Sequence, residues 1–402
     1  MSSNPVIATL GRRLRLAVIG GGPGSFIGGM HRMAARIDDR YELVAGVLSS
    51  DQERAIARAK EIGLQKERGY ASVSRMLDAE KHKEDGADVV AIMTPNDSHF
   101  EFAMAALDHG FDVICDKPMT NTVEEAQTLH DKVVESKRVF CLTHNYTGYP
   151  MTRQARAMAS AGELGIIRLV QVEYVQGGKA DESKPDPTTG SRSWRYDPAI
   201  SGPSLVMGDI GTHAHNLLRF ISNLEVTEVC AERGAIVPGR KVDDYAGALL
   251  RLGNGARGSF WVTQAAAGFE NSLKIRISGT KGSLEWWQEF PQILTFKPLG
   301  APVQTRTSNG PGILPLSARS SRMVAGHPEG FAEGFANIYK DAAEAVAFRI
   351  AGKEADPLAL HFPTSADGLA GVLFVDAVIR SSNNGSSWEK VFWRNRNGKS
   401  CN

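Results

Sequence analysis

The chain has 402 residues, of which 42% are hydrophobic and 23% charged, and its formal net charge is +1. This length suffices for two domains with buried cores, and the composition is that of an ordinary globular protein. A charge so close to zero gives no electrostatic reason to expect a nucleic-acid or anionic-membrane partner. The N-terminus lacks an apolar leader pattern and no apolar run approaches membrane-spanning length, so we expect a cytoplasmic protein without a membrane partner.

Four cysteines are present, and they show no metal-ligand spacing. No metal site is therefore predicted. Cys115 and Cys141 fall within apolar runs that are typical of buried strands, so we expect reduced thiols in the core.

The first 143 residues alternate apolar segments with amphipathic ones. The segment 88–93 is almost wholly apolar, as expected for a strand covered on both faces. This alternation predicts an α/β domain with a doubly wound parallel sheet, a Rossmann domain, whose ligand lies at the carboxyl ends of the strands. Helices are predicted from Ser50 and from Ser98, where a glutamate three residues later gives capping-box spacing, and over 123–133. Strands are predicted at 14–19, 41–48, 88–93, 111–115 and 139–143.

After residue 144 the pattern changes. Residues 144–392 are expected to form an α+β domain with a large, mostly antiparallel sheet, because strand-like segments follow one another with short turns between them. These segments are 167–175, 226–233, 245–252, 258–263, 273–278, 283–287 and 293–296. Helices are expected at 151–161, around Asp209, at 331–351 and at 364–381. Loops are expected at 179–190 and 301–326, and a flexible tail at 393–402.

A glycine-rich segment runs from Gly20 to Gly28, directly after the first predicted strand and into a helix. Such a turn lets the backbone approach a pyrophosphate, and the helix N-terminus adds partial positive charge. Gly20 and Gly22 fit the first two positions of a dinucleotide-binding fingerprint, whereas Gly28 comes three residues late. The predicted cofactor contacts in this loop are Gly20, Gly22, Gly24, Ser25, Phe26 and Ile27.

Ser49 stands at the end of the second predicted strand, where an acid commonly binds the adenosine ribose. A serine there removes the repulsion that a 2′-phosphate would meet, which leans slightly toward NADP. No arginine follows immediately to bind that phosphate. Asp51 could serve the ribose, although capping a helix is its more ordinary role. The cofactor is therefore predicted to be NAD or NADP.

Two further segments end predicted strands. Thr94-Pro95-Asn96 ends the third apolar strand, at the edge where nicotinamide or pyrophosphate should lie. Lys117 follows the strand at 111–115, and a lysine at the edge of a buried strand is costly unless its charge is used. Beside a substrate hydroxyl, its ammonium group would stabilise a developing alkoxide.

Asp209 and His213 lie four residues apart in an expected helix, so a carboxylate and an imidazole project from one face. The unperturbed pKa of histidine, about 6.5, lies close to working pH. His213 could therefore accept a proton while Asp209 orients it.

These motifs resemble those of the glucose–fructose oxidoreductase, inositol dehydrogenase and rhizopine catabolism (Gfo/Idh/MocA) family. The resemblance spans both predicted domains in the family's order, with Asp116-Lys117-Pro118 where the family has Glu-Lys-Pro. It implies that Lys117 and His213 are the catalytic pair, with Asp209 beside them. It also implies that Asp116, Lys117 and His99 join the cofactor contacts, and that the protein is a homodimer or homotetramer.

The activity that the resemblance implies is hydride transfer between NAD or NADP and a ring hydroxyl or carbonyl of a sugar, cyclitol or related polyol. The tryptophan at 194 could stack on a sugar ring and the arginine at 195 could bind hydroxyls or carboxylates, but either could equally be a packing residue. The expected substrate contacts are Lys117, Asn145, Tyr146, Trp194, Arg195, Asp209 and His213.

Two other functions occur on this fold in the family. One is a glycosidase that uses bound NAD for transient oxidation of its substrate. The other is a non-catalytic, sugar-sensing regulator, against which the presence of Lys117, Asp209 and His213 argues. The sequence does not name the substrate, the carbon oxidised or the direction of the reaction.

Overall fold

The computed structural model describes residues 4–180 and 193–392, which form two compact units. The expected tail at 393–402 lies outside the described residues. We expected a single change of domain near residue 143, whereas the structure returns residues 331–368 to the first unit because their apolar side chains complete its core. Within the described ranges, unit 1 contains residues up to 120, 124–148 and 331–368, and unit 2 contains 121–123, 149–330 and the residues from 369 onward.

Unit 1 is built on a parallel sheet whose strand order, over the residues described, is β3-β2-β1-β4-β5-β6. This is the doubly wound Rossmann arrangement that the sequence predicts. The apolar strand β4 is buried along its whole length, because helices cover both faces of such a sheet. The strands are β1 (Leu14–Gly20), β2 (Tyr41–Val47), β3 (Gly69–Tyr70), β4 (Val89–Met93), β5 (Asp112–Cys115) and β6 (Phe140–Leu142).

The helices of unit 1 begin close to the predicted positions, but two of the predicted caps are wrong. Asp51, and not Ser50, caps α3 by accepting from the amide of Arg54 at 2.9 Å. The hydroxyl of Ser98 donates to Pro95 O (2.8 Å) and makes no cap for α5. The helices are α1 (Pro5–Leu10), α2 (Phe26–Ile37), α3 (Gln52–Glu61), α4 (Val73–His82), α5 (His99–Asp108), α6 (Val123–Ser136) and α11 (Phe331–Ile350).

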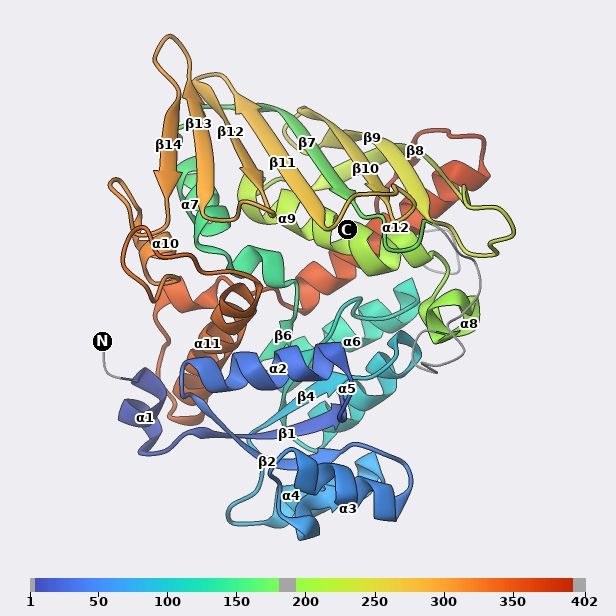
Figure 1. Ribbon diagram of the computed structural model, residues 1–402, viewed down its shortest axis with the longest axis vertical. Helices are drawn as coiled ribbons and strands as arrows, with labels where there is room; N and C mark the ends of the chain where they lie inside the picture. Colours follow the sequence, from blue (N-terminus) through green and yellow to red (C-terminus); the bar gives the residue numbers. More distant parts are fainter. Residues whose placement is uncertain (1–3, 181–192, 393–402) are drawn as a thin grey trace. The chain divides into compact units, whose positions relative to one another are not determined.

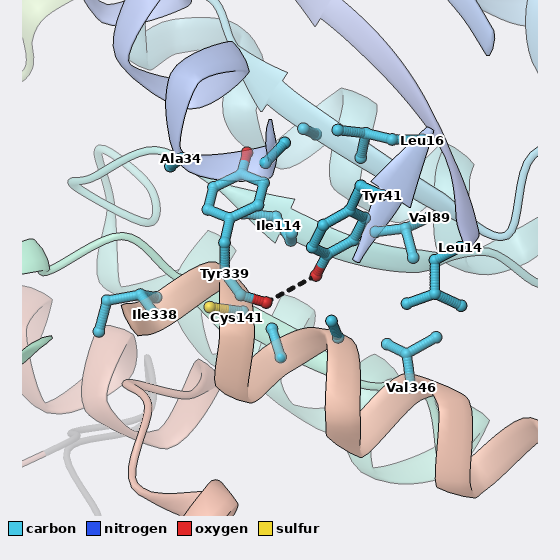
Figure 2. Close-up of a cluster of buried hydrophobic side chains, with 14 of the residues drawn as sticks. Leu14, Leu16, Ala34, Tyr41, Val89, Ile114, Cys141, Ile338, Tyr339 and Val346 are labelled. Atoms are coloured by element: carbon cyan, nitrogen blue, oxygen red, sulfur yellow. Dashed lines mark hydrogen bonds between the residues drawn. The ribbon is translucent and has the colours of Figure 1, made fainter. Parts of the chain in front are cut away.

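Helix α11 comes from late in the chain and lies beside α2 in unit 1 (Figure 1). Its apolar face, which includes Ile338 and Val346, packs on residues of the parallel sheet (Figure 2). The hydroxyl of Tyr41 donates to Tyr339 O at 2.9 Å in this core. An ion pair of 2.6 Å between Arg349 and the buried Asp112 fixes the far end of the helix. The hydrophobic core of unit 1 is therefore complete only when this helix is in place.

Unit 2 contains a large mixed sheet of strand order β14-β13-β12-β11-β7-β10-β9-β8-β15 over the residues described. Each neighbouring pair is antiparallel except β7 and β10, so the predicted mostly antiparallel sheet is confirmed. The strands are β7 (Ile167–Val175), β8 (Val226–Gly234), β9 (Tyr245–Leu252), β10 (Arg257–Thr263), β11 (Ser272–Gly279), β12 (Gly282–Trp287), β13 (Ile293–Pro298), β14 (Gln304–Thr307) and β15 (Glu389–Lys390).

Helices cover one face of this sheet. Leu273, Ile275 and Ile277 of β11 are fully buried on that face, whereas Lys274 and Arg276 point to the other. Helices α7 and α9 lie against the covered face (Figure 1). The segment 301–326, expected to be a loop, also contains β14 and α10. The helices are α7 (Pro150–Ser160), α8 (Pro198–Ser201), α9 (Thr212–Ser222), α10 (Pro315–Ala318) and α12 (Ser365–Asn383).

One helical segment among the described residues, Pro357–Asn383, is long and apolar enough to cross a membrane by length and composition. The sequence had led us to expect no such run. Of its apolar window, 56% is buried inside the protein, where Phe374 contacts the ring of Phe260 in β10. These are the properties of a core helix.

Candidate functional site

The glycine loop joins β1 to α2 and is packed too tightly for larger residues. A Cβ on Gly20 would lie 2.7 Å from Thr94 Cγ2, and one on Gly28 would lie 2.1 Å from Gly21 O. Gly28 is thus the glycine that lets the helix approach the strand, despite its late position in the sequence. Ser25 caps α2 by accepting from Gly28 N at 3.2 Å. The loop therefore presents a helix N-terminus behind a glycine cradle, which suits a diphosphate.

The end of β2 is fixed by an arginine that the sequence analysis missed. Arg58, in α3, donates from Nη1 to Leu48 O at 2.8 Å. A Cβ on Gly22 would lie 3.5 Å from the same nitrogen, so the guanidinium lies between the glycine loop and the strand end. Ser49 accepts a bond of 3.2 Å from the amide of Asp51. No motif signals Arg58, because it is nine residues beyond Ser49 and reaches the site only through the helix.

Thr94-Pro95-Asn96 follows β4, and its carbonyls and hydroxyl are tied to nearby residues. Thr94 Oγ1 lies 2.7 Å from Ser98 Oγ, within hydrogen-bond distance. The two ring nitrogens of His99 lie 3.0 Å from Thr94 O and 2.8 Å from Pro118 O. His99 is fully buried, so it holds two strand ends together through their backbones. A contact between His99 and the cofactor stays a prediction.

Asp116-Lys117-Pro118 follows β5 beside the Thr94 segment. The amide of Asp116 donates to Ile92 O of the neighbouring strand (2.9 Å), and its carboxylate accepts from Thr143 Oγ1 at 2.8 Å. These bonds orient the backbone from which Lys117 extends. Lys117 itself is partly exposed and is followed by a cis peptide bond to Pro118. An ammonium group therefore stands at the carboxyl edge of the parallel sheet, as predicted.

Asn145 and Tyr146 follow β6 at the same edge. Asn145 is only 2% exposed, and its Nδ2 has no hydrogen-bond partner among the described residues. A buried donor without an acceptor is costly, so this amide suits a ligand that brings an acceptor. The ring of Tyr146 packs edge-on against Phe331 at 6.3 Å. Unit 1 thus gathers the glycine loop, Thr94, Lys117 and Asn145 at the ends of adjacent parallel strands.

In unit 2, Asp209 and His213 lie on consecutive turns at the start of α9. The sequence predicts a plain α-helix here, whereas Met207–Gly211 is a π-helical turn that leads into α9. Such turns are frequent at functional sites. His213 is 7% exposed and lies edge-on to the ring of Tyr174, with centroids 6.4 Å apart. The imidazole is therefore largely shielded from water.

The carboxylate of Asp209 is held by two residues that the sequence analysis did not select. Its Oδ2 accepts from Lys179 Nζ at 3.1 Å and from Gln264 Nε2 at 2.8 Å. Lys179 was expected to open an exposed loop, but its side chain is only 14% exposed. The remainder of that predicted loop, 181–190, lies outside the described residues. Lys179 and Gln264 meet because β7 and β10, which precede them, are parallel neighbours.

Trp194 and Arg195 form a short helical turn with their neighbours. The Arg195 guanidinium carbon lies 4.5 Å above the ring of Trp194, so the two side chains stack on each other. Trp194 and Arg195 therefore form a stacked pair. The hydrogen bonds to Asp209 come instead from Lys179 and Gln264.

Several titratable groups are buried away from these segments. Burial lowers the pKa of His31 to about 4, so its ring is neutral at pH 7 and bonds to the hydroxyl of Tyr339 at 2.7 Å. His215 stacks on Phe374, with centroids 4.3 Å apart. Cys115 and Cys141 are free and buried, and burial raises the pKa of both thiols. These residues pack the core, and the expected burial of Cys115 and Cys141 is confirmed. In the part of the chain that the structure describes, no cluster of potential metal ligands occurs.

Comparison with known proteins assigns the chain to a family. Residues 14–145 match the oxidoreductase family with an NAD-binding Rossmann fold, and residues 152–285 match the GFO/IDH/MocA C-terminal domain. The uncharacterized oxidoreductase YfiI of Bacillus subtilis is 34% identical over 94% of this chain and 97% of its own length. Levoglucosan dehydrogenase of Pseudarthrobacter phenanthrenivorans is 29% identical over 68% of this chain and 73% of its own length.

Solved structures agree with these matches. An inositol dehydrogenase homolog from Azotobacter vinelandii, complexed with NAD⁺, is 34% identical, has a TM-score of 0.88 and covers 94% of this chain and 97% of its own. An oxidoreductase from Sinorhizobium meliloti is 45% identical, with a TM-score of 0.83 over 94% of this chain and 99% of its own. With its NAD-binding Rossmann unit, its large second sheet and dehydrogenases among its relatives, the chain belongs to the Gfo/Idh/MocA family of NAD(P)-dependent oxidoreductases.

Proposed function

We propose that the protein transfers hydride between NAD or NADP and a ring hydroxyl or carbonyl of a sugar, cyclitol or related polyol. The observation that carries this proposal is the anchored Asp209–His213 pair: a shielded imidazole one turn from a carboxylate that two donors hold. A positioned imidazole of this kind can accept the proton of a substrate hydroxyl. Two relatives support the substrate class, namely levoglucosan dehydrogenase and an inositol dehydrogenase homolog solved with NADH and myo-inositol.

Each residue has a defined role in this proposal. In the oxidative direction His213 takes the hydroxyl proton, Lys117 stabilises the negative charge on the oxygen, and Asp209 orients His213 or binds a neighbouring hydroxyl. The bound nicotinamide supplies the hydride acceptor. The orphaned Nδ2 of Asn145 supplies a donor for the substrate or the nicotinamide amide, since it needs an acceptor.

Further substrate contacts are proposed from Tyr146, Trp194 and Arg195. The two aromatic rings suit the apolar face of a sugar, and the Arg195 guanidinium suits its hydroxyls. Gly20, Gly22, Gly24 and the α2 N-terminus at Ser25, Phe26 and Ile27 are proposed to bind the pyrophosphate. Ser49 is proposed at the adenosine ribose, and Thr94-Pro95-Asn96 with Asp116 at the nicotinamide side.

The test is nicotinamide reduction with a panel of polyols that includes myo-inositol and levoglucosan. His213→Asn is expected to lower kcat/KM by about 10²- to 10⁴-fold, the usual effect of losing a general base, and to leave NADH affinity unchanged. His327→Asn, which changes an exposed histidine of the same unit, is the matched control and should behave as wild type. Wild-type turnover by His213→Asn would refute the assignment.

A parallel assay with aryl glycosides separates the proposed dehydrogenase from a glycosidase on the same fold. A dehydrogenase produces reduced cofactor and releases no aglycone. Aglycone release without net cofactor reduction would replace the proposal with NAD-dependent glycoside cleavage.

We also propose that the protein is a homodimer or homotetramer that associates through the uncovered face of the unit 2 sheet. Leu169, Leu249 and Trp261 alternate with buried residues along three adjacent strands and are 54%, 57% and 41% exposed. Exposed apolar side chains on one face of a sheet favour association. A cytoplasmic location is proposed as well, because the buried thiols of Cys115 and Cys141 are free.

A further inference from the structure

The backbone of Lys179 is fixed on both sides in unit 2. Its amide donates to Gln264 O at 3.1 Å, and its carbonyl accepts from Arg240 Nη2 at 2.6 Å. Arg240 is in turn paired with Asp244 at 2.9 Å, and both of these side chains are at most 1% exposed. A buried ion pair of this kind sets a geometry firmly, because moving either partner leaves an unpaired charge. Lys179 therefore projects from a rigid base.

The side chain of Lys179 closes a triangle with Asp209 and Gln264. Its Nζ lies 3.1 Å from Asp209 Oδ2 and 2.5 Å from Gln264 Oε1. The amide nitrogen of Gln264 donates to Asp209 Oδ2 at 2.8 Å and to Gln176 Oε1 at 3.0 Å. Both amide hydrogens of Gln264 are thus used inside the protein. These contacts fix the position of Asp209 Oδ2 and place the positive charge of Lys179 beside it.

An ordinary surface ion pair contributes little to the stability of a protein, and its side chains are held loosely. This pair differs, because the side chains of Lys179 and Asp209 are only 14% and 27% exposed and a third residue bonds to both. A second polar group extends the arrangement, since Gln176 also donates to Asn271 Oδ1 at 2.6 Å. Burying the Lys179 ammonium group is unfavourable by itself, and its ion pair with Asp209 offsets that cost.

We propose that Lys179 is a positioning residue of the catalytic site that acts through Asp209. It holds the Asp209 carboxylate in one orientation one turn from His213 and places a positive charge beside it. This inference rests on the proposed function, because it takes His213 as the proton acceptor and Asp209 as the residue beside it. Lys179 itself contacts neither substrate nor cofactor in this role.

The test is a double-mutant cycle of Lys179→Met and Asp209→Asn, read in steady-state kinetics with the best polyol of the panel. Lys179→Met is expected to lower kcat about 10- to 100-fold with a smaller change in KM. In the Asp209→Asn background the same change is expected to cost less than about threefold, because the charge that Lys179 serves is already gone. Lys179→Gln, which keeps a donor without the charge, should recover part of the loss.

Lys281→Met is the matched control, since this exposed lysine lies in the β11–β12 turn, at the opposite end of the strands. It should keep wild-type kcat and KM. Equal losses from Lys179→Met in both backgrounds, or no loss at all, would overturn the inference while leaving the proposed function intact. A wild-type protein inactive on the whole panel would instead refute the proposed function.

Urea unfolding tests the pairing without any substrate, using the wild type, Lys179→Met, Asp209→Asn and the double variant. If Lys179 is the counter-ion of Asp209, the double variant's midpoint falls by less than the sum of the two single falls. Additive falls would overturn the inference whatever the activity. Lys179→Gln provides a second cycle should the methionine variant fail to fold.

Discussion

Arg58 is a single residue on which the choice of cofactor can depend. It lies at the end of β2, where Rossmann proteins hold the adenosine ribose, and its guanidinium is bonded to Leu48 O beside Gly22. Ser49 adds no negative charge at this position. A ribose 2′-phosphate would therefore meet the Arg58 guanidinium there, and Ser49 brings no charge that would repel it.

We predict that Arg58→Ala weakens NADPH binding about 10- to 100-fold more than NADH binding. The reason is that a hydrogen bond to a charged group is worth about 1.5–3 kcal/mol. Titration followed by nicotinamide fluorescence measures both affinities. Arg54→Ala, on the exposed side of the same helix, is the control and should change neither. An equal loss for the two cofactors would show that Arg58 serves the pyrophosphate instead.

At the scale of elements, the junction between β1 and α2 depends on the close approach of Gly28 in the helix to the backbone of Gly21 in the loop. A Cβ at Gly28 would lie 2.1 Å from Gly21 O, whereas one at the adjacent Gly29 would have no neighbour within 4 Å. A glycine-to-alanine substitution therefore adds the same methyl group at a crowded position, Gly28, or at an open one, Gly29.

Gly28→Ala is predicted to lower NADH affinity at least tenfold and to reduce the melting temperature, because the helix must move away from the loop. Gly29→Ala should leave the affinity unchanged and raise stability slightly, since alanine favours a helix by about 0.5–1 kcal/mol over glycine. Thermal melts with and without NADH report both effects. Equal behaviour of the two variants would contradict the packing argument.

Elements with a strong apolar period could be predicted from the sequence, and those without it could not. β9 was placed at its observed bounds, and α11 and α12 within two residues of them. β3 has only two residues, and α4 buries few apolar side chains, so neither gives a clear pattern. The return of α11 to unit 1 was also missed, because helical periodicity shows which face is buried but not which sheet covers it.

The same limit applies to the candidate site. Lys117, Asn145, Asp209 and His213 could be proposed because each follows a strand or lies on a helix in a known order. Lys179 and Gln264 could not, since they are 85 residues apart and meet only through the parallel pairing of β7 and β10. Such contacts come from tertiary structure and leave no local spacing in the sequence.

At the scale of the whole molecule, the uncovered sheet face of unit 2 should determine the assembly. The apolar positions 169, 249 and 261 are accompanied by a charged group in which Glu285 pairs with Arg276 at 2.9 Å. Protein interfaces combine apolar side chains with polar and charged ones.

Trp261→Lys is therefore predicted to shift the protein to a smaller species, because a like charge from each partner would be buried at the contact. Light scattering after size exclusion measures the mass. Phe269→Lys, at an exposed apolar residue outside the strands, should keep the wild-type mass. An unchanged mass for Trp261→Lys would place the interface elsewhere.

The division of unit 1 between the two halves of the chain has a consequence for biosynthesis. Residues 331–368 complete the core formed by the first 148 residues, and in the sequence they follow every strand of the second sheet except β15. A ribosome releases them only after residues 149–330 have emerged. The first 148 residues therefore remain without α11 while residues 149–330 are being synthesised. This interval is when a chaperone would be of most use to the polypeptide.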